Sequence, residues 1–168
     1  PTAISLSASA INENDLGAVV GTITTTDEDA DDTVEYSLSG TDAESFEVVD
    51  GQLRLKSDVS ADYETKTSYS VTVTVTDSGG LTTSNGFTVS VNNLNDNSPS
   101  ITSSASYSAD ENQTSVGTVT ATDADGDDVT FTISGSDLSI TSSGVIFSCI
   151  HPNEAIKFIF PLGEDPGL

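Results

Sequence analysis

Apolar and polar residues alternate along short stretches of the chain, and Gly, Asp or Asn bounds each stretch. The clearest example is residues 69–75, Tyr-Ser-Val-Thr-Val-Thr-Val, where the alternation lasts a full strand length. A period of two residues is typical of a β-strand with one buried face. Over residues 1–97 this alternation predicts seven strands. They lie near residues 3–11, 18–26, 33–39, 45–49, 52–55, 67–77 and 82–92.

Turn residues separate these strands where hairpins would need them. Asp50-Gly51 lies between the fourth and fifth strands and suits a two-residue hairpin turn. Gly79-Gly80 lies between the last two strands, and no stretch has convincing helical periodicity. Short strands with these turn signals predict an all-β fold, a Greek-key seven-stranded β-sandwich.

The first part of the chain is repeated further along. Residues 13–27 are similar to residues 111–123, and Asp27 matches Asp123 at an offset of 96 positions. The match continues as Tyr36 with Phe131 and as Ser39-Gly40 with Ser134-Gly135. A period of this length suits a train of sandwich domains. We therefore expect a first repeat over residues 1–97 and the N-terminal half of a second over residues 98–148.

The segment 149–168 differs from the rest of the chain. It contains no Ser or Thr, although both are abundant before it, and it holds the single Cys, Cys149, and the single His, His151. Nothing in it matches the later strands of the first repeat. We expect this tail to lie outside the fold, and the second sandwich to be truncated with a core that does not close.

Charge narrows the possible partners. Four Lys and Arg stand against 27 Asp and Glu, for a formal net charge of −23. This balance excludes nucleic acid and anionic lipid as natural partners, since both need a basic surface. No run approaches the roughly 18 apolar residues of a membrane span, so we expect no direct membrane insertion of this fragment. The excess carboxylates are either a solvated surface or ligands for hard cations that prefer oxygen.

The acidic residues lie at the ends of predicted strands. Strand ends alternate between the two poles of an antiparallel sandwich, so Glu13, Glu64 and residues 93–97 should share the C-terminal pole of the first repeat. The N-terminal poles should hold, by the same reasoning, Asp27, Asp29 and Asp77 in the first repeat and Asp123 and Asp125 in the second. Two like charges about 4 Å apart cost about 1 kcal/mol in water and about 4 at an effective dielectric of 20. Ca²⁺ relieves such repulsion by taking about six to eight oxygen ligands.

These clusters match the motifs of a known family in order and spacing. They are Asn12-Glu13-Asn14, Asp62-Tyr63-Glu64, Asp77-Ser78-Gly79, Asn95-Asp96-Asn97-Ser98-Pro99 and Asp123-Ala124-Asp125. The set resembles the PEN, DRE, DxG, DxNDNxP and DxD motifs of cadherin repeats. The abundance of Ser, Thr and Asp and the scarcity of Lys are similar to the bacterial and marine versions found in large surface proteins.

The resemblance implies calcium ligands at the junction of the repeats. An outer ion would be held by Glu13, Asp62, Glu64 and Asp96, with Glu13 and Glu64 bridging to a middle ion. The middle ion would be completed by Asn93, Asp96 and Asp125. A third ion would be held by Asn95, the Asn97 carbonyl, Asp123 and Asp125. Half of an equivalent site shared with a preceding repeat would consist of Asp27, Asp29 and Asp77, and Glu111 would serve a following linker.

Two departures from the family pattern affect these sites. Asn93 stands where the family usually has Asp, so the middle ion loses one negative charge. The third ion also needs a counterpart of Asp77 in the second repeat, which the expected truncation removes. We therefore expect two well-formed sites and one weakened site.

The resemblance implies an extracellular, calcium-binding tandem repeat that rigidifies a cell-surface adhesion protein, with neighbouring repeats as partners. A protein or carbohydrate ligand at the cell surface and homophilic adhesion remain open. The alternative is a carbohydrate-binding or spacer module of a secreted polysaccharide-degrading enzyme, which would need exposed aromatic residues, and this chain has no Trp. We expect no catalysis, because there is no Gly-rich phosphate loop or serine elbow. Cys149, His151 and Glu154 are too few for a closed transition-metal site.

Overall fold

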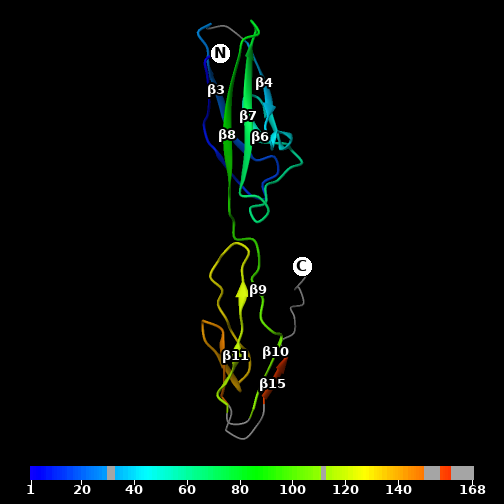
Figure 1. The fold of residues 1–168 in the computed structure, drawn as a ribbon, viewed down its shortest axis with the longest axis vertical. Helices are drawn as coiled ribbons and strands as arrows, with labels where there is room; N and C mark the ends of the chain where they lie inside the picture. The colour runs from blue at the N-terminus through cyan, green and yellow to red at the C-terminus, as the bar shows by residue number, and fades with distance from the viewer. Residues whose placement is uncertain (30–32, 111–112, 150–155, 160–168) are drawn as a thin grey trace. The chain divides into compact units, whose positions relative to one another are not determined.

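The computed structural model describes residues 1–29, 33–110, 113–149 and 156–159 of the chain. It divides into two compact units, Pro1–Leu94 and Asn95–Leu168, where the sequence predicted a boundary after residue 97. Both units consist of β-strands, drawn in Figure 1. In the described residues no helix has the length and apolar character that crossing a membrane requires.

The first unit contains two four-stranded sheets. One has the order β1-β3-β6-β5, and its strands are Ala3–Leu6, Val19–Thr26, Gln52–Leu55 and Phe46–Val49. The other has the order β2-β8-β7-β4, and its strands are Ala10–Asn12, Thr82–Asn92, Ser68–Asp77 and Val34–Ser39. A short 3₁₀ helix, η1 (Ala43–Ser45), precedes β5. All described pairings in this unit are antiparallel except that of β2 with β8. The predicted all-β sandwich is confirmed.

The first predicted strand is divided into β1 and β2, which belong to different sheets. The chain crosses between the sheets at Ser7–Ser9, directly over Gly21. A Cβ atom on Gly21 would lie 2.8 Å from the backbone nitrogen of Ala8 and 2.8 Å from Ser7 Oγ. The N–H of Thr22 donates to Ser7 Oγ at 2.9 Å. The absence of a side chain at Gly21 therefore lets the chain cross from one sheet to the other at Ser7–Ser9. The alternation of apolar and polar residues does not predict this crossing.

The core of the first unit is built from the inward positions of both sheets. In β7 these are Tyr69, Val71, Val73 and Val75, and the three valines are fully buried. Burying each such apolar side chain contributes about 1.5–3 kcal/mol. The Tyr69 ring meets the Phe46 ring of β5 edge to face, with centroids 5.6 Å apart. The long β7–β8 hairpin that carries this pattern is visible in Figure 1.

The hairpin turn predicted at Asp50-Gly51 is confirmed. Asp50 has φ 52° and Gly51 has φ 72°, so both occupy the left-handed region. Two consecutive residues of this kind match the twist of the flanking strands β5 and β6. The turn fixes the antiparallel register Val49↔Gln52.

The second unit repeats one of these sheets. A three-stranded sheet has the order β11-β14-β13, and its strands are Ser115–Thr118, Val145–Ser148 and Leu138–Ile140. β12 (Ala121–Thr122) pairs with β9 (Ser100–Ile101). The register shift between Ser115 and Gly117 matches the one between Val19 and Gly21, 96 positions earlier. The internal repeat read from the sequence is thus also a repeat of backbone geometry.

The described part of the tail takes part in strand pairing. β15 (Ile156–Ile159) pairs antiparallel with β10 (Ser106–Ala109), where the sequence analysis expected a tail outside the fold. The sequence Ile-Lys-Phe-Ile is rich in residues that favour strands, although its composition differs from the repeat. Glu111, His151 and Glu154 lie outside the described residues.

The buried cores of the two units are unequal. Among the described residues, the core of the second unit consists of Val119, Leu138 and Ile146, with half-buried neighbours such as Tyr107 and Phe131.

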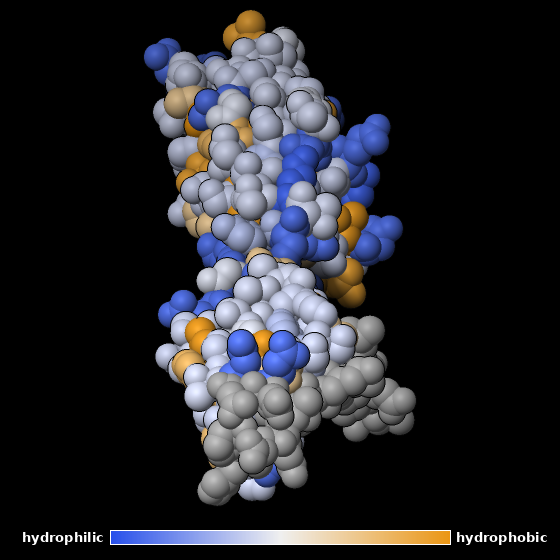
Figure 2. Space-filling model, turned by 60° about the horizontal axis from the view of Figure 1, so that its bottom comes forward, coloured by the Kyte–Doolittle hydropathy of each residue, from blue (hydrophilic) through white to orange (hydrophobic). Residues whose placement is uncertain are grey.

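On the face shown in Figure 2, hydrophobic residues form small separate groups among hydrophilic ones. The described residues on that face therefore form no large continuous apolar patch of the kind that marks a permanent interface.

Candidate functional site

Glu13 is a buried carboxylate at the C-terminal pole of the first unit. It follows β2 and is only 1% exposed. Its Oε2 accepts a hydrogen bond from the backbone N–H of Tyr63 at 2.7 Å, and its Oε1 accepts one from Leu94 N–H at 2.6 Å. Hydrogen bonds to an ionised acceptor are short and strong, which offsets the cost of burying the charge. Glu13 thereby joins three segments of the chain at this pole.

A turn after β2 sets the position of Glu13. Asn14 has φ 64°, a conformation that Asn adopts more readily than most residues. Its N–H donates to the carbonyl of the fully buried Ala61 at 3.0 Å. This contact places the Asn12-Glu13-Asn14 motif beside the loop that carries Asp62 and Glu64.

That loop is held by its own hydrogen bonds. Asp62 Oδ1 accepts from Thr65 N–H at 3.0 Å, and Asp62 Oδ2 accepts from the Thr65 hydroxyl at 2.9 Å. The Asp62 carbonyl accepts from Lys66 N–H at 2.8 Å. The Asp62 carboxylate thus shapes the loop, in addition to any role as a metal ligand.

Lys66 anchors the end of the loop to the body of the sandwich. Its ammonium forms an ion pair with Asp42 and lies 4.9 Å from the centre of the Tyr69 ring. The Lys66 ammonium, together with the N–H of Ser70, lowers the pKa of Asp42 below its ordinary value. This polar network fixes the approach to Glu64 from the C-terminal side.

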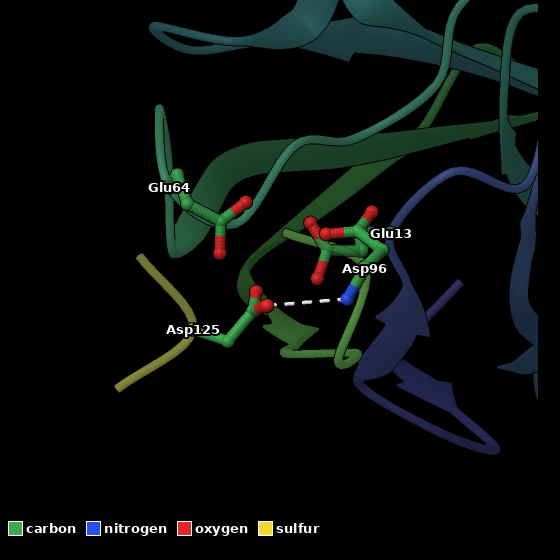
Figure 3. A group of neighbouring side chains, drawn as sticks. All are labelled: Glu13, Glu64, Asp96 and Asp125. Atoms are coloured by element: carbon green, nitrogen blue, oxygen red, sulfur yellow. Dashed lines mark hydrogen bonds between the residues drawn. The ribbon is translucent and has the colours of Figure 1, made fainter. Parts of the chain in front are cut away.

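Glu64 brings a second carboxylate to the same pole. It is exposed, and one of its carboxylate oxygens lies within 4.8 Å of one of Glu13. Figure 3 shows both side chains. Two negative charges at this distance repel by about 1 kcal/mol in water and more where solvent is excluded. A cation between them would turn this repulsion into attraction.

The second unit has its own acidic pole, built on Asp125. Asp125 Oδ2 accepts from the backbone N–H groups of Asp96 (3.1 Å, dashed in Figure 3) and Asn97 (2.8 Å). Its Oδ1 accepts from the Asn97 side-chain amide at 3.1 Å. Carboxylate oxygens of Asp96 and Asp125 lie within 4.8 Å of each other. The segment 95–97 is therefore folded onto the Asp125 loop.

Asp123 shapes that loop from within. Its Oδ1 accepts from Asp125 N–H at 2.9 Å, in the same way that Asp27 Oδ1 accepts from Asp29 N–H at 3.1 Å in the first unit. Asp127 also belongs to the pole, because it accepts a hydrogen bond from the Asn95 side-chain amide. The sequence analysis did not single out Asp127. The signal for it was the spacing of three aspartates, each two positions from the next.

The first unit's N-terminal pole brings Asp27 and Asp77 together. The backbone nitrogen of Pro1 lies 2.9 Å from Asp27 Oδ2 and 3.4 Å from Asp77 Oδ2, so the two carboxylates converge on one point. Asp77 is 6% exposed, and its Oδ1 accepts from Leu81 N–H at 2.8 Å.

The structure therefore distributes the predicted site residues over separate poles. The C-terminal pole of the first unit holds Glu13, Asp62, Glu64 and, directly after β8, the exposed Asn93. The N-terminal pole of the second unit holds Asn95, Asp96, Asn97, Asp123 and Asp125. All carry oxygen atoms suited to a hard cation such as Ca²⁺. Within each pole, carboxylate oxygens of two different residues lie within 4.8 Å of each other.

Comparison with known proteins gives consistent matches. The family model described as "Cadherin domain" matches residues 7–92. A human protein, cadherin-related family member 2, is 34% identical over an alignment of 105 residues, and the match covers 54% of this chain and 8% of that protein. The chain thus spans less than a tenth of the length of this curated relative.

Solved structures have the same architecture. Human protocadherin-24 EC1-2 aligns with a TM-score of 0.67 at 23% identity, covering 88% of this chain and 80% of that one. N-cadherin EC1-4 of Drosophila gives 0.69 at 23% identity, covering 89% and 41%. Chicken VE-cadherin EC1-2 gives 0.61 at 26% identity, covering 86% and 79%. These similarities support the β-sandwich fold.

Proposed function

The chain belongs to the cadherin family, and from this premise we propose that it is a calcium-binding extracellular repeat that stiffens a cell-surface adhesion protein. The observation that carries the proposal is the burial of the Glu13 carboxylate close to a second carboxylate. The buried carboxylate of Glu13 has an oxygen within 4.8 Å of an oxygen of the exposed Glu64 carboxylate. A divalent cation with oxygen preference is the simplest group to balance such a pair.

The proposed ligands follow the poles described above. An outer Ca²⁺ is assigned Glu13, Asp62, Glu64 and Asp96. A middle ion is assigned Glu13, Glu64, Asn93, Asp96 and Asp125. A third, weaker ion is assigned Asn95, the Asn97 carbonyl, Asp123 and Asp125. The N-terminal pole of the first unit, with Asp27, Asp29 and Asp77, is assigned to a site completed by a preceding repeat.

The proposed stiffening of the parent protein depends on the short connection between the two units. Leu94, whose N–H binds Glu13, is the last residue of the first unit, and Asn95 is the first of the second. An ion that takes ligands from both sides of this peptide bond restricts the rotation of one repeat against the next. Extracellular modules of this kind bind with Kd of about 10⁻⁴–10⁻³ M, which suits extracellular calcium. The partners are neighbouring cadherin repeats.

Thermal unfolding of the chain in EDTA, in millimolar Ca²⁺ and in millimolar Mg²⁺ tests the proposal. At a calcium concentration of 100 times Kd, binding to the native state alone adds about 2.7 kcal/mol, a shift of several degrees in Tm. Glu64→Gln should abolish most of this shift. Glu35→Gln, an exposed carboxylate on β4, is the matched control and should keep it. An equal shift with Mg²⁺, or the same shift in both variants, would rule out the proposed site.

A further inference from the structure

Two Asp-Gly steps occur in the described part of the chain, one in each unit. They are Asp50-Gly51, the turn between β5 and β6, and Asp125-Gly126, in the acidic pole of the second unit. Glycine has no Cβ atom, so nothing on the residue itself hinders its backbone nitrogen from attacking the aspartate side chain before it. The two steps are chemically alike, and their surroundings therefore decide which of them reacts.

The reacting groups of the Asp50-Gly51 step are accessible and make no hydrogen bonds. Asp50 is exposed, and a Cβ atom built on Gly51 would meet nothing within 4 Å. Within the described residues, the Asp50 carboxylate accepts no hydrogen bond and the Gly51 N–H donates none. The carboxyl group can therefore turn toward the nitrogen of the next residue without breaking an existing contact.

Asp50 is also held in a conformation that few residues with a side chain adopt. Its φ of 52° lies in the left-handed region, where a residue with a Cβ atom is less stable than glycine. The turn is held between its two strands by the register Val49↔Gln52. The hairpin thus imposes this geometry on Asp50, whose own side chain does nothing to fix it.

The Asp125-Gly126 step has the same sequence in a different environment. Asp125 Oδ2 accepts from the N–H groups of Asp96 and Asn97, and its Oδ1 accepts from the Asn97 side-chain amide. The Gly126 N–H donates to the Asp123 carbonyl at 3.3 Å. Both reacting groups are therefore engaged, and these hydrogen bonds must break before they can meet.

An asparagine followed by glycine can react in the same way, and Asn85-Gly86 is such a step. It lies inside β8, where Asn85 pairs with Val73 and Gly86 pairs with Thr72. The Asn85 amide donates to the Ile4 carbonyl at 3.1 Å. The side chain is thus held, and the strand pairing resists the backbone rotation that ring closure needs.

We propose that Asp50-Gly51 is a modification site, at which aspartate converts spontaneously to isoaspartate in the folded protein. The Gly51 nitrogen attacks the side-chain carboxyl carbon of Asp50, and the carboxylic acid hydroxyl leaves as water with the proton of that nitrogen. Water then adds to the main-chain carbonyl carbon of Asp50 and breaks its bond to the Gly51 nitrogen, which takes up a proton. One water leaves and one enters, no electrons are exchanged, and the chain now runs through the former side chain.

The rearrangement lengthens the turn by one backbone carbon atom. The Gly51 carbonyl accepts from the Ile23 N–H of β3 at 2.8 Å, so the turn is also connected to a third strand. On β6, Leu53 and Leu55 are fully buried in the core of the first unit. A longer turn disturbs the register that keeps these side chains inward, and the modified chain should be less stable.

Peptide mapping of the aged protein tests the proposal. The full chain is kept at neutral pH in EDTA for several weeks, so that the result does not depend on the proposed calcium sites. The product has the same mass as the original chain, so its peptides are fragmented by electron transfer, which distinguishes isoaspartate from aspartate at each position. Asp125 must first give up hydrogen bonds that Asp50 does not make, and we expect about tenfold more isoaspartate at position 50 than at position 125. Position 85 should also stay below position 50.

The same measurement in urea is the control for sequence effects. Unfolding removes the surroundings of both Asp-Gly steps, so positions 50 and 125 should then react at similar rates. A large excess at position 50 in urea would contradict the role of the folded environment. Equal isoaspartate at the two positions in the folded chain, or none at position 50, would overturn the proposal.

Asp50→Gly supplies the matched variant. Gly-Gly fits a two-residue hairpin turn, and glycine accepts the φ of residue 50 without a steric penalty. The unmodified chain should lose several degrees of Tm as isoaspartate accumulates, and the aged Asp50→Gly chain should keep its Tm. An equal loss of Tm in both chains would also overturn the proposal, since the damage would then lie elsewhere.

Discussion

Glu13 Oε1 accepts a hydrogen bond of 2.6 Å from the N–H of Leu94, a residue 81 positions further along the chain. The second oxygen of the same carboxylate accepts from Tyr63 N–H. The side chain therefore fixes the end of the first unit before any ion binds. A residue assigned to calcium is also a structural element of the metal-free sandwich.

Replacing Glu13 with Gln should destabilise the first unit even in EDTA. The amide NH₂ of Gln cannot accept a hydrogen bond, so the partly buried N–H of Tyr63 or of Leu94 loses its acceptor. We expect a loss of about 1–3 kcal/mol in the free energy of unfolding. Urea denaturation followed by circular dichroism measures it. Glu35→Gln, at an exposed position, should change the midpoint little, and an equal loss in both variants would contradict the structural role of Glu13.

Asp125→Asn should loosen the segment that begins the second unit. Asp125 Oδ2 accepts from two backbone N–H groups, those of Asp96 and Asn97. Removing the charge weakens both bonds, and we expect exchange of these two amide protons to rise about tenfold in EDTA. Hydrogen exchange followed by NMR measures each amide separately. Asp128→Asn, an exposed neighbour in the same loop, should leave both rates unchanged.

Gly21→Ala should destabilise the first unit through the crossing between its sheets. The new Cβ would lie 2.8 Å from the backbone nitrogen of Ala8, so the crossing segment must move. Overpacking of this kind costs about 1–3 kcal/mol. Gly86→Ala is the matched control, because there the nearest atom, Thr72 Oγ1, is 3.8 Å from the new Cβ. Thermal melts that rank the two variants equally would show that the close approach at Gly21 is relieved at little cost.

Stability should depend on pH through Asp42. Its pKa is lowered in the folded state by the Lys66 ammonium and the Ser70 N–H. A lowered carboxyl pKa stabilises the fold above the unfolded value of about 3.9, and this contribution is lost as the pH falls through the folded value. The stability difference between the unmodified chain and Asp42→Asn should therefore be largest near pH 6 and shrink below about pH 4. Urea midpoints at several pH values measure it, and a difference that stays constant down to pH 2 would contradict the ion pair.

The fold was predictable where its signals are local. The alternation in β7 and the Asp50-Gly51 turn each occupy a few consecutive residues, and both have the predicted structure. The division of the first strand was not predictable, because it depends on the close approach of Gly21 in β3 to Ala8 in the segment between β1 and β2. The pairing of β15 was missed because the composition of the tail differs from the repeat, and composition does not determine pairing.

For the candidate site, the sequence predicted at which end of each unit the acidic residues lie. Strand parity places Glu13 and Glu64 at one end of the first unit, and their carboxylates lie within 4.8 Å. The burial of Glu13 could not be read from the sequence, because it depends on N–H groups 50 and 81 positions away. The role of Asp127 in holding Asn95 is equally non-local. The assignment of each residue to an ion stays a prediction.

The unequal cores have a calorimetric consequence. Fourteen buried apolar residues form the core of the first unit, against three among the described residues of the second. The enthalpy and heat capacity of unfolding grow with the apolar surface exposed, so the first unit should dominate the endotherm of the whole chain. The second unit should open at a lower cost and absorb little heat in doing so. The unfolding of the second unit is better monitored by the fluorescence of Tyr107, the single tyrosine in that part of the sequence.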